Sequence, residues 1–373
     1  MLIVVNTRLL LKDRLDGIGY FTYETLKRIT PQHPEHEFVF AFDRPYSEEF
    51  IFSHNVSPVV VPPPARHPFL WYVWFERSLP KLFKRVRPQL FLSTDGYLSL
   101  RSKIKSVAVI HDINFEHYPK DLPFFYRNYY RHYFPKYAEH ATRIATVSEF
   151  SKNDIAEKYH VPKDKIDVVY NGANEKFIPL NENERQQVRK QFSQGQPYFI
   201  FVGSLHARKN ISNMLKAFDM FKKEESSPLK FIIAGSKRWW TSEMETTYQA
   251  LQHKQDVIFT SRVSDTDLYL LTGDAFAAVY TSSFEGFGIP LVEAMNCNVP
   301  VITSNVTAMP EIGGEAALLV DPFSIQSIAN GMRTIWKDET LRNSLIEKGK
   351  VQRQKFSWDK TASLLWNCVE KVL

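Results

Sequence analysis

Two glutamates, Glu285 and Glu293, flank a glycine-spaced loop in the second half of the chain. The residues between the first glutamate and the expected start of a short helix are, in order, Gly286, Phe287, Gly288, Ile289 and Pro290. Glycines let backbone amides approach a ligand closely, and a helix N-terminus attracts an anion. This loop therefore suits a phosphate, and the flanking carboxylates suit the hydroxyl groups of a sugar. Taken alone, a pair at this spacing is more often a loop carboxylate and a solvated helix residue.

The wider sequence around the pair, from Thr281 to Pro322, resembles the donor-binding signature of family-4 retaining glycosyltransferases. The run EGFGIPLVEAM, followed by PVITSN and PEIGGEAALLVDP, places two glutamates in the frame that this family uses. In such enzymes the first glutamate contacts the transferred sugar and the second contacts the nucleotide ribose. The resemblance therefore implies those roles for Glu285 and Glu293, a nucleotide-sugar donor, and donor contacts from residues 286–289.

The bulk composition is that of an ordinary globular protein. The chain has 373 residues, of which 44% are hydrophobic and 24% charged, and this length favours two domains. We expect no signal peptide, since the first apolar run, Leu2–Val5, is short and follows no basic segment. No apolar run approaches the roughly 20 residues that span a bilayer. We therefore predict a cytoplasmic protein, with Cys297 and Cys368 as reduced core thiols.

Both halves of the chain alternate short apolar runs with helical stretches, which is typical of doubly wound parallel sheets. In the first half we expect strands at Leu2–Val5, Phe38–Phe42, Val59–Val61, Leu90–Leu92, Val107–Ile110, Ile144–Val147 and Val168–Tyr170, and helices near Tyr20–Ile29, Leu70–Val86, Phe124–Glu139 and Ser151–Tyr159. In the second half we expect strands at Tyr198–Val202, Phe231–Ala234, Val257–Phe259, Ala275–Tyr280, Val299–Thr303 and Leu318–Val320. Ligands bind at the carboxyl ends of such strands.

A polar stretch between Pro179 and Pro197 separates the two alternations, so we expect the domain boundary there. The prediction is an acceptor-side Rossmann-like domain over residues 1–180 and a nucleotide-sugar-binding Rossmann-like domain over 181–355. By resemblance, a helix over 356–373 returns to the first domain. Two doubly wound α/β domains facing a central cleft form the GT-B architecture.

Candidate residues in the first domain follow its strands. His111 comes directly after the apolar run Val107–Ile110, at a strand's carboxyl end. The stretch AVIHDINFEHYP resembles the family's segment in which a histidine lies beside the reacting carbon, so we assign a catalytic role to His111. Asp112 is equally suited to cap the following loop, so we leave it out of the catalytic set. Gly17 and Gly19 are a weak pair by themselves, but the family has a similar pair over the donor phosphates, and we assign them donor or acceptor contacts.

Cations follow the first strand of the second domain. Gly203 begins the loop that leads to Arg208 and Lys209. Adjacent cations usually form a solvated face, but at a strand tip they would meet a pyrophosphate. Family members often carry an arginine directly after the glycine, and this chain has Ser204 instead. Because that arginine is replaced, we expect catalytic phosphate neutralisation to depend on Arg208 and Lys209, and we assign donor binding to Gly203.

No metal or cofactor is expected. Ser264-Asp265-Thr266-Asp267 contains a D-x-D string, which holds a metal in other glycosyltransferases, but Ser264 three residues before Asp267 fits a helix N-cap better. We find no H-E-x-x-H, Walker loop or paired C-x-x-C.

The sequence therefore predicts a retaining, metal-independent hexosyltransferase. The donor is a nucleotide-diphosphate sugar, with GDP-mannose favoured over UDP- and dTDP-sugars, and the acceptor is a glycan or a lipid-linked glycan in surface polysaccharide or glycoconjugate synthesis. One alternative is a nucleotide-sugar epimerase on the same fold; a pyridoxal-dependent phosphorylase needs a lysine Schiff base and a longer chain.

A second alternative is a basic, aromatic-rich protein that binds membranes or nucleic acid. The net charge is +6 and the pI is near 9.0, which indicates an anionic partner without identifying it. Residues 69–88 mix two kinds of side chain suited to a membrane surface. These are the cations Arg77, Lys81, Lys84, Arg85 and Arg87 and the apolar residues Trp71, Trp74, Phe75, Leu79, Leu82 and Phe83. For the enzyme we expect peripheral membrane contact through this segment and no nucleic acid.

Overall fold

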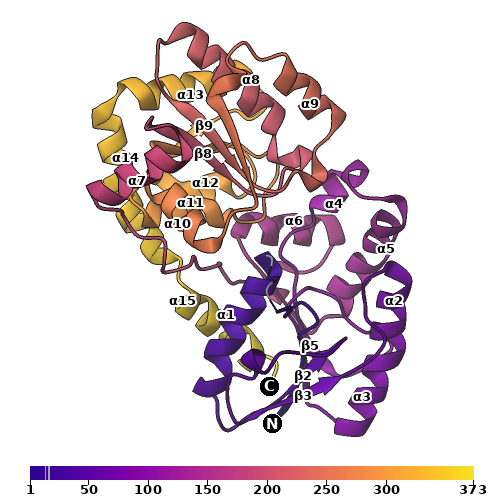
Figure 1. The fold of residues 1–373 in the computed structure, drawn as a ribbon. Helices are drawn as coiled ribbons and strands as arrows, with labels where there is room; N and C mark the ends of the chain where they lie inside the picture. Colours follow the sequence, from indigo (N-terminus) through magenta and orange to yellow (C-terminus); the bar gives the residue numbers. More distant parts are fainter. Residues whose placement is uncertain (13, 16) are drawn as a thin grey trace. The chain divides into compact units, whose positions relative to one another are not determined.

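The computed structural model describes residues 1–373 apart from 13 and 16, and these residues form two compact units (Figure 1). Unit 1 consists of Met1–Asn171 and Trp358–Leu373, and unit 2 of Gly172–Ser357. Each unit has one parallel β-sheet between helices, so each is an α/β unit of the doubly wound type.

Unit 1 contains a seven-stranded sheet in the order β3-β2-β1-β4-β5-β6-β7. The strands are β1 (Leu2–Asn6), β2 (Glu37–Phe42), β3 (Val56–Val60), β4 (Leu90–Ser93), β5 (Lys105–Val109), β6 (Arg143–Thr146) and β7 (Ile166–Val168). Most of their residues are buried, as expected of parallel strands covered on both faces. The strand order reverses between β1 and β4, and such a switch point is where ligands bind in open α/β sheets.

Helices cover both faces of the unit 1 sheet. One core packs α1 (Gly17–Gln32) and α15 (Trp358–Glu370) against the sheet through residues such as Phe21, Leu26 and Trp366. The other core packs the helices that follow β3, β5 and β6. These are α2 (Pro68–Val73), α3 (Leu79–Val86), α4 (Asn114–His117), α5 (Phe124–His140) and α6 (Glu149–Tyr159).

The stretch predicted as one helix over Leu70–Val86 consists of α2, a π-helical turn at Trp74–Ser78, and α3. Its side chains correct the prediction of a mixed aromatic and basic membrane face. The apolar residues are each no more than 6% exposed and belong to the core: Trp71, Trp74, Phe75, Leu79, Leu82 and Phe83. The cations remain exposed: Arg77, Lys81, Lys84, Arg85 and Arg87. The amphipathic pattern of these residues therefore reflects packing on the sheet, and the exposed aromatic side chain of the segment is Phe69, at its start.

Unit 2 contains a six-stranded sheet in the order β10-β9-β8-β11-β12-β13, with its switch point between β8 and β11. The strands are β8 (Tyr198–Val202), β9 (Lys230–Ala234), β10 (Val257–Ser261), β11 (Ala277–Tyr280), β12 (Val301–Ser304) and β13 (Ala317–Val320). The helices are α7 (Glu182–Phe192), α8 (Ile211–Glu224), α9 (Ser242–Gln249), α10 (Asp265–Gly273), α11 (Ile289–Asn296), α12 (Met309–Gly313), α13 (Ile325–Lys337) and α14 (Glu339–Gln352). No helix within the described ranges is both long and apolar enough to cross a bilayer.

The chain passes from unit 1 to unit 2 at Asn171 and Gly172, ahead of the polar stretch where we expected the boundary. The segment after Gly172 packs on α10. Asn174 Nδ2 donates to the Tyr269 hydroxyl at 3.0 Å, and the Phe177 ring contacts the Tyr269 ring edge-on at 4.7 Å. These contacts attach residues 172–180 to unit 2 before its first helix begins.

Candidate active site

Two charged loops meet at the carboxyl edge of the unit 2 sheet. The first follows β8 and ends in a 3-10 turn over Ala207–Lys209, and the second follows β11 and contains Glu285. Because β8 and β11 are parallel neighbours at the switch point, both loops leave the same edge of the sheet. Lys209 Nζ lies 2.5 Å from Glu285 Oε1, and Arg208 Nη1 lies 3.1 Å from the same oxygen.

This cluster is largely withdrawn from water. Glu285 and Lys209 are each 7% exposed. Burial alone would raise the pKa of Glu285, but the charges of Lys209 and Arg208 outweigh it and hold the pKa at about 2. Lys209 also donates to the Tyr280 hydroxyl, which in turn lies 3.3 Å from Glu285 Oε1. One carboxylate and two cations leave a net positive charge at this edge, which suits an anionic ligand.

The loop after Glu285 has a backbone that only glycine adopts readily. Gly288 has a φ of +102°, and a Cβ built there would lie 2.6 Å from Cε of Met309. Gly288 caps α11, which begins at Ile289 with Pro290 in its first turn. Gly286 and Phe287 are buried, and the Phe287 ring packs edge-on against Phe356 at 5.4 Å. The predicted phosphate loop is thus held in place at a helix N-terminus by its aromatic side chain.

Glu293 lies on α11 in a different environment from Glu285. It lines a small cavity with residues that include Thr272, Tyr280 and Pro290. Although its side chain is partly exposed, the surroundings of its carboxyl raise the pKa to about 8, mainly by burial and secondarily through Asp265. The two predicted glutamates therefore differ in charge near neutral pH. Tyr280 contacts the first and lines the cavity of the second.

In unit 1, His111 lies where the sequence predicts it, just beyond the end of β5. Its Nε2 lies 2.9 Å from the carbonyl oxygen of Thr94, and its ring meets Phe21 edge-on at 4.8 Å. Since a carbonyl can only accept, Nε2 carries a proton and donates it to Thr94. Thr94 follows β4, so the histidine is oriented from the switch point of the unit 1 sheet.

Gly17 and Gly19 occupy the first turn of α1. Gly19 is buried, whereas a Cβ built on Gly17 would meet nothing within 4 Å. Packing within the described residues therefore does not require glycine at position 17. The predicted site residues thus form two groups. One is at the carboxyl edge of unit 1, with His111, Gly17 and Gly19, and the other is at the carboxyl edge of unit 2.

Sequence reasoning missed three residues of the unit 2 group. Tyr280 is the last residue of β11, and the T-S-S-F-E sequence after it was the available signal. Asn210 Nδ2 donates to the carbonyls of Thr281 and Pro322 at 2.9 and 2.7 Å and so fixes the second loop. His206 stacks on Trp239 at 4.4 Å, and burial, with the nearby cations, lowers its pKa to about 4.

Two cap predictions are confirmed. The Ser264 side chain accepts a hydrogen bond from the Asp267 amide at 3.1 Å, so the D-x-D string forms the first turn of α10. Asp112 Oδ1 accepts from the Asn114 amide at 3.0 Å and so caps the loop after His111. Cys297 and Cys368 are buried free thiols, as predicted.

Two protein families match the chain in succession, Glycosyltransferase Family 4 over residues 15–177 and Glycosyl transferases group 1 over residues 182–352. O-antigen chain mannosyltransferase B of Escherichia coli is 26% identical over 366 residues, covering 94% of each chain. O-antigen chain mannosyltransferase RfbU of Salmonella typhimurium is 31% identical over 270 residues, covering 72% of this chain and 71% of that protein.

A solved structure covers the whole fold. Anabaena Alr3699/HepE in complex with UDP and glucose matches with a TM-score of 0.77 at 15% identity, over 99% of both chains. The two doubly wound units agree with this likeness, since each has the strand order of a Rossmann-like sheet. The chain therefore belongs to the family-4, or group 1, glycosyltransferases and has the GT-B fold.

Proposed function

We propose that the protein is a retaining, metal-independent mannosyltransferase. It transfers a mannosyl residue from GDP-mannose to a glycan or lipid-linked glycan during synthesis of a surface polysaccharide. The observation that carries the proposal is the cluster of buried Lys209 and Glu285 with partly buried Arg208 at the switch point of unit 2. The two O-antigen mannosyltransferases to which the chain is similar support the choice of sugar and of polymer.

In this proposal the donor diphosphate binds over the net positive cluster and the amides around Gly286–Gly288. Negative charge grows on the departing diphosphate in the transition state, so preorganised cations and amides there lower the barrier. Arg208 and Lys209 supply the charge that a divalent metal would otherwise provide.

The glutamates then have separate tasks. Glu285 contacts the sugar and Glu293 the ribose, while His111 lies beside the reacting carbon. Glu285 is a poor nucleophile because two cations hold its pKa at about 2. This supports a route in which the leaving phosphate oxygen takes the proton of the acceptor on the same face of the sugar.

The two rival functions receive less support. An epimerase would use the same donor without an acceptor, and the polymer-forming relatives favour transfer. A binding protein that inserts the predicted apolar face of 69–88 would have to expose Trp74 and Phe75, which are fully buried, and Phe69 is the one large apolar side chain of this segment that is exposed among the described residues.

We also propose peripheral membrane contact through the exposed cations of residues 77–87, which would be electrostatic. Each cation near an anionic bilayer contributes about 1 kcal/mol at low salt. Flotation with anionic vesicles should therefore weaken steeply as salt rises, and binding that resists high salt would contradict this proposal.

The main test is product analysis with EDTA present. The purified protein is incubated with GDP-mannose, UDP-glucose or a dTDP-sugar and with an α-mannoside acceptor, and nucleoside diphosphate release is followed. We expect GDP release and an α-linked product by NMR, which is retention of the donor configuration. An inverted linkage, or activity only after Mn²⁺ is added, would contradict the mechanism.

A further inference from the structure

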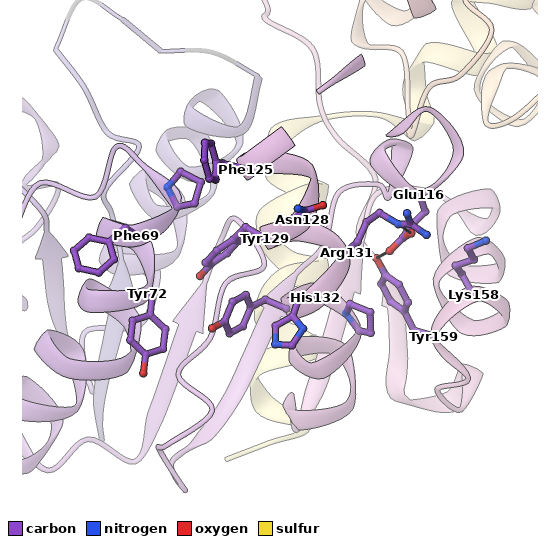
Figure 2. A pocket seen from close by; sticks show the side chains of 13 residues that line it. Phe69, Tyr72, Glu116, Phe125, Asn128, Tyr129, Arg131, His132, Lys158 and Tyr159 are labelled. Carbon is purple, nitrogen blue, oxygen red and sulfur yellow. Dashed lines mark hydrogen bonds and ion pairs between the residues drawn. The ribbon is translucent and has the colours of Figure 1, made fainter. Parts of the chain in front are cut away.

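Unit 1 has an open groove of about 850 Å³ that runs across the outer side of α5, between α2 and α6 (Figure 2). Its volume is within the range of small-molecule sites. His111, Gly17 and Gly19 are not among its lining residues. The groove is therefore separate from the predicted catalytic edge of this unit.

Aromatic rings line much of the groove. Phe69 and Tyr72 project from α2, and Phe125 and Tyr129 project from α5 (Figure 2). Tyr133 of α5 also lines the groove. Phe69 and Phe125 are 67% and 66% exposed. The Tyr72 and Tyr133 rings, from different helices, lie 6.5 Å apart. Exposed aromatic rings gathered in one groove mark a ligand or partner surface, because folding alone gains nothing from them.

The polar side chains at the other end are paired with one another. Glu116, whose side chain is 6% exposed, accepts from Arg131 Nε at 3.1 Å and from the Tyr159 hydroxyl at 3.2 Å. The acidic and basic lining residues are Glu116, Arg131 and Lys158, so this ion pair cancels two of the three charges and leaves that of Lys158. The remaining polar side chains of the lining are Asn128, which carries an amide, and His132, whose Nε2 accepts from Lys136 Nζ at 2.8 Å.

This combination selects a class of ligand. An anionic headgroup calls for several cations that are not already neutralised, and Arg131 is held by Glu116. A purely apolar chain would cover the Asn128 amide and the charged Lys158 and Arg131 groups and offer none of them a hydrogen bond. A sugar ring has an apolar C–H face that stacks on aromatic rings and an edge of hydroxyls that meets amide, guanidinium and imidazole groups.

We infer that this groove binds a segment of uncharged oligosaccharide, as a second glycan site apart from the reacting centre. The inference rests on the proposed function, in which the acceptor or product is a polymer of neutral sugars. A chain held at this groove stays with the enzyme between transfers. Bound product segments would therefore lengthen the polymer made per encounter.

The test measures binding of α-linked manno-oligosaccharides of increasing length by calorimetry, on the full-length protein. The variant Phe125→Ala/Asn128→Ala removes two exposed side chains of the groove. Phe323→Ala is the matched control, since Phe323 is 65% exposed in unit 2. We expect the groove variant to bind the oligosaccharides at least about tenfold more weakly than wild type. Both variants should bind GDP as wild type does.

A second measurement addresses the consequence for the product. The groove variant should keep its turnover on a monosaccharide acceptor and make shorter chains on a long one. Equal oligosaccharide affinity in wild type and groove variant, or none in wild type, would overturn the inference.

Flotation with phosphatidylglycerol vesicles tests whether the groove binds a membrane instead of a glycan. If Phe125→Ala/Asn128→Ala abolishes vesicle binding and leaves oligosaccharide binding intact, the groove faces a membrane and the inference is wrong. Failure of the proposed function is distinguishable, because calorimetry needs no turnover. A protein inactive with GDP-mannose whose glycan binding depends on the groove would contradict only the proposed reaction.

Discussion

The ammonium group of Lys209 lies 2.5 Å from the carboxylate of Glu285, and both residues are almost entirely removed from solvent. The sequence suggests that Lys209 either meets a phosphate or forms part of a solvated face. Its burial excludes the solvated face and adds a structural role. A buried ion pair contributes little more stability than a well-packed apolar pair, but the loss of one partner leaves the other charge buried and unpaired.

Replacing Lys209 should therefore destabilise the protein as well as lower its activity. We expect Lys209→Met to cost about 3–5 kcal/mol of unfolding free energy, reduced somewhat because Arg208 still contacts Glu285. The double variant Lys209→Met/Glu285→Gln should recover much of this loss, since no charge remains unpaired. Urea unfolding of wild type, Lys209→Met, Glu285→Gln and the double variant completes a double-mutant cycle. Lys223→Met, on the exposed side of α8, is the control and should change stability by less than about 0.5 kcal/mol. Additive single effects would show that the pair is not coupled.

Arg208 allows a cleaner test of phosphate neutralisation, because its side chain is 20% exposed and the fold depends on it less. Arg208→Ala should lower single-turnover rates about a hundredfold, since a preorganised charged donor contributes roughly 3 kcal/mol in the transition state. Binding of the donor should change only modestly. A rate within about threefold of wild type would contradict a role in phosphate neutralisation and leave Arg208 a structural role, through contacts such as those with Glu285 and the Phe284 carbonyl.

Substitutions of the two glutamates should have different effects on nucleotide binding and on turnover. Glu285→Gln is expected to reduce turnover more than affinity for the nucleoside diphosphate, because this carboxylate is assigned to the sugar. Glu293→Gln should mainly weaken nucleotide binding, because it is assigned to the ribose. Calorimetry with GDP, compared with single-turnover rates, gives both quantities. Equal losses of GDP affinity in the two variants would overturn the assignment.

Glu293 should also make stability depend on pH. Its pKa is raised from an ordinary 4.5 to about 8, so the folded state binds a proton more tightly than the unfolded state. The stability contributed by that proton is complete below pH 4.5 and is lost as pH rises to 8. The change in unfolding free energy caused by Glu293→Gln should therefore be more favourable at pH 8 than at pH 5. We expect the difference to be about 1–3 kcal/mol after allowing for the partial exposure of Glu293. Asp265 and Cys297 interact with the same carboxyl and are present in both proteins compared. A stability difference that does not change with pH would contradict the shift.

Gly288 and Gly17 should respond in opposite ways to alanine. Gly288→Ala forces a positive φ and a contact with Met309, so we expect a loss of about 1–3 kcal/mol in thermal or urea unfolding. Gly17→Ala should leave stability unchanged or slightly raised, since alanine is the better helix former. A fall in activity with intact stability would then show that Gly17 is needed for close approach of a ligand. Unchanged activity would remove Gly17 from the site.

Much of the fold could be predicted because parallel strands buried on both faces read as apolar runs. Val107–Ile110 and Tyr198–Val202 show this, and His111 and Gly203 follow from where those runs end. The segment around Trp74 shows the limit. The spacing of apolar residues alone does not show whether an aromatic stripe faces a sheet or a membrane. The observed packing shows that this stripe belongs to the hydrophobic core.

The pairing inside the site was beyond sequence reasoning for a related reason. Lys209 and Glu285 are far apart in the chain, and they meet because β8 and β11 are neighbours across the switch point. Strand order is a property of the assembled sheet, so the sequence could suggest each charge without indicating which charges would neutralise one another. The lowered pKa of Glu285 follows from that arrangement, whereas the raised pKa of Glu293 comes from burial of its carboxyl and from the charge of Asp265.

The last helix has a consequence for how the protein is made. α15 supplies Leu365, Trp366 and Val369 to the core of unit 1, although all of unit 2 is synthesised before it. At roughly 5–20 residues per second, the ribosome needs on the order of ten seconds or more to complete unit 2. During that time one face of the older sheet lacks its final cover and exposes apolar side chains. The unit that is begun first is thus finished last, and a transcript truncated before Trp358 yields a chain whose exposed core marks it for chaperones and proteases.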